Sequence, residues 1–253
     1  MHLWTVSAIV LLGCGPAPAG NPRGGRALGP QAAAEIFTTM LATYATAATY
    51  TDQGELVDVY THENGRRYGT IASLNNSFLR PDRFRFVLGP ESDFMGEPAP
   101  NDESVPQYQI LRDGSRVISD FYLDEAPEEL WTLDAALGAA CGVSHGTSRL
   151  IAPLLYGTGK ASVGLLSGYG DLMLGDDAVV DGVECLELGA KNSDGDELRV
   201  LVGKDDYLIR RVIERQSLPG KHRIPQALLA SATGSTADNL SSRLWSAPEA
   251  TTQ

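Results

Sequence analysis

The chain has 253 residues, of which 43% are apolar and 21% are charged, a composition that predicts a globular protein rather than a disordered one. Its 20 Lys and Arg stand against 32 Asp and Glu, and the formal net charge of -12 disfavours nucleic acid as a partner because the phosphate backbone would be repelled. No apolar run approaches the roughly 20 residues of a membrane-spanning helix, so we expect no such helix.

The first residues resemble a bacterial lipoprotein signal peptide. An apolar stretch, LWTVSAIVLLGC, ends in Gly13 and Cys14, and a passage rich in Gly, Pro and Ala follows. No Lys or Arg precedes the apolar stretch, which is a departure from the usual pattern. The resemblance predicts a signal peptide over residues 1–13, lipidation of Cys14, and a flexible tether over residues 14–30.

Two hypotheses about these first residues both predict an exported protein, either lipid-anchored or soluble. Gly15 follows the cysteine where a retention signal would have Asp, so a lipid anchor would hold the protein at the periplasmic face of the outer membrane. Alternatively, cleavage after the A-x-A sequence Ala17-Pro18-Ala19 would release a soluble periplasmic protein. An oxidising compartment would then permit a disulfide between Cys141 and Cys185, which are otherwise two small buried side chains.

Hydrophobic periodicity divides the rest of the chain into helices and paired strands. Residues 31–50 have a helical period, and alternating strands with turn signals occupy residues 54–88 and 108–122. Residues 126–156 favour a helix, a break and a second helix, and strands return from residue 178 to about 216. We expect turns at Asn64-Gly65, Asp113-Gly114, Asp181-Gly182 and Asp194-Gly195, and a weak last strand around residues 240–245. Runs of hairpins with interposed helices predict the α+β class.

The sequence GVSHG, residues 142–146, matches the G-x-S-x-G nucleophile elbow of serine hydrolases. A working elbow lies between a strand and a helix, whereas the residues before Gly142 are rich in Ala and Leu with a helical period. Nothing positions His222 as a triad member, and His145 is adjacent to Ser144. We therefore interpret the motif as a turn between helices in which Ser144 or Thr147 caps the helix that begins near Ser148, and expect no catalytic residues.

The sequence indicates neither a metal site nor a cofactor. The four histidines are scattered and no C-x-x-C pair is present. The segment NSDGDE, residues 192–197, lacks the full spacing of a calcium loop and is more typical of a hairpin tip.

Three further segments resemble one family. The stretch AAAEIFTTMLATYATAATYTDQGEL leads from a helix into a strand, SFLRPDRFRFVL follows, and VDGVECLELGAKNSDGDELRVLVGKDDYLIRRV comes later. They are similar to the LolA-like outer-membrane lipoprotein carrier superfamily, in particular to a predicted periplasmic lipoprotein branch of it. The resemblance implies a single domain over residues 31–250. Its expected fold is a curved, incompletely closed antiparallel β-sheet, a half-barrel, with helices packed on the concave face.

The same resemblance implies an apolar cavity for acyl chains. Seven apolar residues are the candidates for its lining: Phe78, Phe84, Phe86, Leu150, Ile151, Leu154 and Leu155. Ordinary core packing explains the same residues equally well. A protein anchored through Cys14 cannot shuttle between membranes as the soluble carriers do, so a fixed binding module is expected instead of a carrier.

Two functional hypotheses from different classes follow. The first is an exported, lipid-anchored, non-enzymatic protein that binds a lipid, an acyl chain or a lipidated protein. The second is a structural or interaction lipoprotein with a packed core, which recruits a protein partner through a surface such as the acidic segment 89–107. A serine esterase acting through GVSHG is a weaker alternative.

Overall fold

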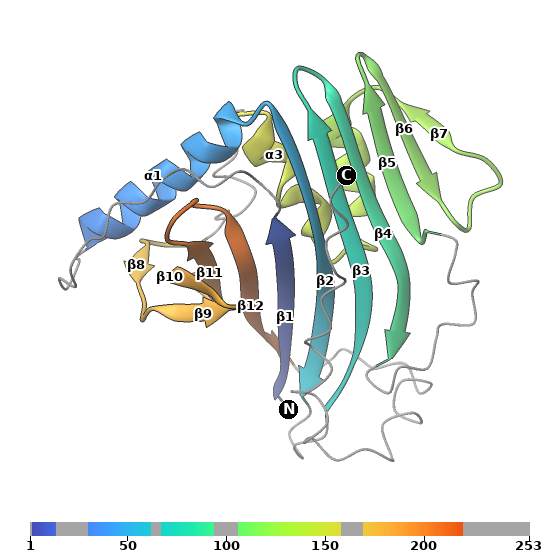
Figure 1. Ribbon diagram of the computed structural model, residues 1–253. Helices are drawn as coiled ribbons and strands as arrows, with labels where there is room; N and C mark the ends of the chain where they lie inside the picture. The colour runs from blue at the N-terminus through green and yellow to red at the C-terminus, as the bar shows by residue number, and fades with distance from the viewer. Residues whose placement is uncertain (1, 14–29, 62–66, 94–105, 158–168, 220–253) are drawn as a thin grey trace.

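One antiparallel sheet organises the molecule (Figure 1). The computed structural model describes residues 2–13, 30–61, 67–93, 106–157 and 169–219. The sheet has 12 strands, in the order β7-β6-β5-β4-β3-β2-β1-β12-β11-β10-β8, with β9 paired to β10 beside this path. Because the sheet is not closed into a barrel and helices accompany it, the predicted class, α+β with a curved and incompletely closed antiparallel sheet, is confirmed.

The elements follow the chain in this order. The strands are β1 (His2–Gly13), β2 (Thr49–Thr61), β3 (Arg67–Leu79), β4 (Arg83–Asp93), β5 (Tyr108–Asp113), β6 (Arg116–Phe121), β7 (Glu128–Leu130), β8 (Met173–Leu174), β9 (Ala178–Val180), β10 (Val183–Lys191), β11 (Glu197–Gly203) and β12 (Ile209–Pro219). The helices are α1 (Pro30–Thr46), α2 (Leu133–Ala140), the 3-10 turn η1 (Thr147–Arg149) and α3 (Ala152–Leu155).

Three predicted turns are present where the sequence indicates them. Gly114, between β5 and β6, has φ +64°, and Gly195, between β10 and β11, has φ +86°. Between β9 and β10, Asp181 and Gly182 both have positive φ (51° and 78°), as a two-residue type I′ hairpin requires. The predicted turn at Asn64-Gly65 and the weak last strand at residues 240–245 lie outside the described residues.

The strand β7 corrects the expectation of helix from residue 126 onwards. Glu128 and Leu130 suit a helix by composition, but Leu130 pairs with Val117 and Glu128 pairs with Ser119 on β6. The ladder offered by β6 outweighs the weak local preference for helix. The first helix of this region, α2, therefore begins only at Leu133, where the side chain of Thr132 accepts a hydrogen bond from the backbone N–H of Ala135.

The predicted signal peptide coincides with β1. Its backbone pairs antiparallel with β12, from His2↔Pro219 to Val10↔Arg211, and with β2, from Trp4↔Thr61 to Gly13↔Asp52. A signal peptide that is removed would not keep this place in the mature protein. The signal peptide over residues 1–13 stays a prediction, as do the tether and the lipidation of Cys14, which lie among residues 14–29 outside the described part.

Alternation along the strands directs apolar side chains to one face of the sheet. On β4, Phe84, Phe86 and Leu88 are buried whereas Arg83 and Arg85 are exposed, as the sequence predicts. The buried faces of the strands, together with α1, α2 and α3, form one large hydrophobic cluster. A second, smaller cluster of Val180, Cys185 and Leu201 lies apart from it.

The guanidinium of Arg80 holds two helices to the turn between β3 and β4. Its Nη2 donates to the carbonyl oxygens of Ala45 (2.7 Å) and Leu155 (2.9 Å), and its Nε donates to that of Ala47 (3.0 Å). Ala45 and Leu155 lie in the last turns of α1 and α3, whose final carbonyls have no partner within their own helix. The positive charge also complements the negative end of both helix dipoles.

Replacing Arg80 tests this anchor. We expect Arg80→Ala to lower the free energy of unfolding by about 2 kcal/mol, because hydrogen bonds to charged groups contribute ~1.5–3 kcal/mol and three carbonyls lose theirs. Arg83→Ala is the matched control: Arg83 belongs to the same RPDRF sequence, but its ion pair with Asp113 is exposed (63% and 76%), so we expect a loss under about 0.5 kcal/mol. Urea unfolding of both variants measures the difference, and equal losses would refute the anchor.

Candidate functional site

The interior between the sheet and the helices contains all seven residues predicted to line a cavity. Phe78 on β3 and Phe84 and Phe86 on β4 are 0–4% exposed, and the four residues from the η1–α3 segment are 0–7% exposed. All seven belong to the one large hydrophobic cluster. The structure therefore brings these residues together, and their role as ligand contacts stays a prediction.

Tyr156, at the end of α3, is a polar member of this interior. Its ring lies edge-on to Phe78 (5.2 Å between centroids) and Phe84 (6.4 Å), and the guanidinium of Arg112 lies 4.8 Å from the ring centroid. Burial raises the pKa of the phenol, and the nearby charge of Arg112 only partly offsets this effect. The Oη atom is buried and has no partner of ordinary hydrogen-bond geometry within the described part of the chain, although a hydrogen-bonding contact with Arg112 lowers the pKa of the phenol.

Thr147, in η1, presents a second buried oxygen of this kind. Thr147 is 5% exposed, and its Oγ1 has no hydrogen-bond partner among the described residues. Buried polar atoms are nearly always hydrogen-bonded, and an unsatisfied one costs about 1–3 kcal/mol. Two hydroxyls on the same helical segment could therefore bind a polar group of a molecule from outside the chain.

The GVSHG motif forms a turn between α2 and η1, not between a strand and a helix. Ser144 is fully buried, and its Oγ accepts a hydrogen bond from the backbone N–H of Ser148 (3.2 Å). Ser148 in turn donates its hydroxyl to the carbonyl oxygen of Leu137 in α2 (2.9 Å). Ser144 thus satisfies a backbone N–H of η1, but the N-cap residue of that turn is Gly146, without a side-chain cap bond, so the predicted capping by Ser144 or Thr147 is not seen in its usual form.

His145 connects this turn to two strands of the sheet. With φ +47° its backbone is left-handed, and its Nδ1 lies 2.9 Å from Oδ2 of Asp58 on β2. Its Nε2 lies 3.8 Å from Oε1 of Glu91 on β4. The contact with Asp58 and the nearby carboxylate of Glu91 raise the pKa of the imidazole to about 10, so it is an imidazolium at neutral pH. A protonated histidine between two carboxylates has no nitrogen available to accept a proton from Ser144.

A second buried carboxylate lies in a network that the sequence did not reveal. Asp52 on β2, 1% exposed, accepts hydrogen bonds from the hydroxyl of Tyr50 (2.8 Å) and from the backbone and side-chain amides of Asn76 (both 2.9 Å). Burial raises its pKa to about 6 against the opposing effect of these bonds. Tyr50 also packs on Tyr44 of α1 (5.3 Å), whose Oη accepts the backbone N–H of Ile209. Asp52 and Leu56 are four residues apart on β2, so alternation places their side chains on the same, buried face. The burial of Asp52 could have been inferred from this spacing.

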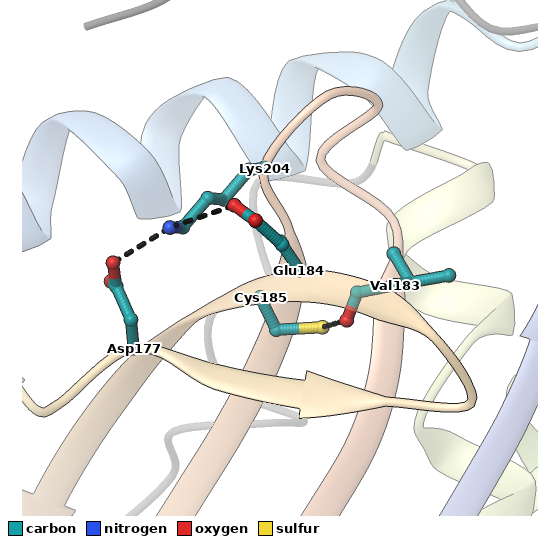
Figure 2. A network of polar contacts seen from close by, with 5 residues as sticks. All are labelled: Asp177, Val183, Glu184, Cys185 and Lys204. Atoms are coloured by element: carbon teal, nitrogen blue, oxygen red, sulfur yellow. Dashed lines mark hydrogen bonds and ion pairs between the residues drawn. The ribbon is translucent and has the colours of Figure 1, made fainter.

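Cys141 and Cys185 are both free thiols. Cys141 caps the C-terminus of α2, whereas Cys185 on β10 belongs to the smaller cluster, on the other face of the strand from Leu188 of the main core. The bridge that the sequence allowed is therefore not formed. Figure 2 shows the surroundings of Cys185: its thiol donates to the carbonyl oxygen of Val183 (3.4 Å).

An ion network lies beside this thiol. Lys204 donates to Asp177 (2.6 Å) and to Glu184 (3.2 Å) (Figure 2). The two carboxylates are largely exposed (65% and 73%), so the pairs contribute little to stability. At the opposite end of β10, the NSDGDE segment connects β10 to β11 as the predicted hairpin tip, in which Oδ1 of Asn192 accepts the backbone N–H groups of Asp194 and Asp196.

Comparison with known proteins adds no relative. No protein-family model matches the chain, and no curated protein matches it either. None of the helices in the described part of the chain is long and apolar enough to cross a membrane.

The His145 clamp makes stability depend on pH. The folded-state pKa of His145 (about 10) lies above its ordinary value of 6.5, so its contribution is complete below pH 6.5 and is lost as the pH rises through about 10. We expect His145→Gln to destabilise the protein at pH 6, and the difference from wild type to shrink toward pH 10. Chemical unfolding of both proteins at several pH values measures this difference. A difference that does not change with pH would contradict a charged histidine.

Proposed function

We propose that the protein is an exported, lipid-anchored and non-enzymatic binding protein that holds an amphiphilic ligand with an acyl chain between its sheet and its helices. The observation that carries the proposal is the large apolar cluster between the sheet and the helices, together with two buried hydroxyls, Thr147 and Tyr156, that lack a partner of ordinary hydrogen-bond geometry among the described residues. An acyl chain suits the apolar side chains, and a carbonyl or hydroxyl group of a lipid suits the two oxygens.

The architecture supports the same proposal. A single curved antiparallel sheet that packs against helices is the arrangement that the sequence resemblance to LolA-like carriers implies. The helical segment η1–α3 is short, and Leu150 to Leu155 lie within it, so a small displacement of this segment would admit a ligand without breaking the sheet. An anchor at Cys14 would keep such a protein at one membrane, where it would receive or present its ligand.

Tyr156→Phe tests the ligand contact. If Oη contacts a ligand, the variant should bind a fluorescent fatty acid several-fold more weakly, while the ligand-free protein should become more stable by about 1 kcal/mol because an unsatisfied hydroxyl is removed. Tyr122→Phe is the matched control, because Tyr122 is 38% exposed.

Mass spectrometry of organic extracts from the protein purified from the periplasm should reveal stoichiometric lipid or fatty acid. A stable protein without extractable ligand and without fatty-acid binding would contradict the proposal.

Cys14→Ser tests export and anchoring. The unaltered protein should have the intact mass of a chain that begins at an acylated Cys14 and should partition into detergent, whereas the variant should lose the acyl mass and remain in the aqueous phase. An unacylated chain beginning after Ala19 would support the soluble periplasmic alternative. A mature chain that retains residues 2–13 would refute cleavage and leave β1 in the sheet.

A further inference from the structure

The strand β7 forms one end of the sheet and has a free edge. It pairs with β6 on one side, and no strand in the described ranges pairs with the other side. Figure 1 shows it at the outer end of the sheet, beyond β6. The backbone N–H and C=O groups of a free edge can pair with an extended segment of another chain.

Exposed apolar side chains flank this strand at both ends. Trp131, directly after β7, is 96% exposed, and Leu123, in the connection from β6, is 67% exposed. Tyr122 beside it is 38% exposed. Large apolar side chains this exposed on both sides of a free strand edge are typical of interaction sites.

The charge around β7 is of one sign. Between residues 121 and 134 the chain has five carboxylates and no Lys, Arg or His; they are Asp124, Glu125, Glu128, Glu129 and Asp134. Among the described contacts, one basic side chain reaches β7: Arg116 on β6 forms an exposed ion pair with Glu129. We name the region from Tyr122 to Trp131 the β7 edge surface.

We propose that the β7 edge surface binds an extended, Lys- or Arg-rich segment of another protein by adding it to the sheet as a further strand. The free edge selects an extended backbone, and the carboxylates select basic side chains. The exposed indole of Trp131 binds cations over its face, which favours the same residues. Charges on an edge strand also protect against aggregation, but that role accounts for the carboxylates and not for Trp131 and Leu123.

Two other occupants fit less well. A second copy of this chain would oppose the same acidic edge, and like charges at an interface are unfavourable. A membrane surface with anionic lipids would be repelled by the five carboxylates, although Trp131 by itself suits an interface.

The test uses the full chain and a synthetic peptide of alternating Lys and Val, with binding measured by calorimetry. We expect binding that weakens with salt and is absent for a Glu/Val peptide of the same length. We also expect no binding of the Lys/Val peptide when alternate amides are N-methylated, because the methyl groups remove the backbone donors of one edge. Equal binding of the methylated peptide would overturn the strand addition.

Variants locate the site. Trp131→Ala should weaken binding about tenfold, which is the loss of a typical hot-spot side chain, and a double Glu125→Lys, Glu128→Lys variant should abolish it. Val179→Ala is the matched control, because Val179 is 66% exposed at the other end of the sheet. All these side chains are exposed, so the variants should fold, as circular dichroism can verify. Equal affinity of the Trp131 and Val179 variants would overturn the assignment, as would Trp131-dependent binding to phosphatidylglycerol vesicles in place of the peptide.

Discussion

The contact of the Arg80 guanidinium with the ends of α1 and α3 is the constraint on which the arrangement of the interior depends. A helix as short as α3 (Ala152–Leu155) has almost no stability of its own, since most of its carbonyls lack partners within the helix. Arg80 provides one such partner and ties the same charge to α1. The anchor adjoins Tyr156, whose ring lies edge-on to Phe78 on β3 and Phe84 on β4.

Two carboxylates on β2 show how the sheet accommodates buried carboxyl groups with different kinds of partner. Asp58 faces the imidazolium of His145, so the GVSHG turn brings its own cation to the sheet. Asp52 has neutral donors instead, and its raised pKa reflects the cost of burying a charge with only hydrogen bonds around it. The motif that resembles a nucleophile elbow thus contributes structural contacts: Ser144 accepts the backbone N–H of Ser148, and His145 bridges Asp58 and Glu91.

The strand β1 and the proposed export concern the same residues. In the structure β1 separates β2 from β12 and pairs with both. Removal of residues 1–13 would leave two facing strand edges inside the sheet, in addition to the free edge of β7.

Local pattern was sufficient for most of the fold. The helical period of residues 31–50, the alternation of Phe84, Phe86 and Leu88 with arginines, and Asp-Gly pairs at hairpin turns each predict their element, because burial on one face imposes a period of 3.6 or 2. The clustering of the seven interior residues could also be predicted, since apolar faces of neighbouring elements must meet.

Only the tertiary structure decided the features that join distant segments. β7 is a strand because β6 lies beside it, and its residues by themselves favour helix. The contacts of His145 with Asp58 and Glu91, of Arg80 with Ala45 and Leu155, and of Asp52 with Asn76 join residues 24 or more positions apart. The tertiary structure also keeps Cys141 and Cys185 apart as free thiols, because α2 and the face of β10 that contains Cys185 are not packed together. Periodicity reports which face a side chain occupies, whereas its partner depends on how the faces are brought together in space.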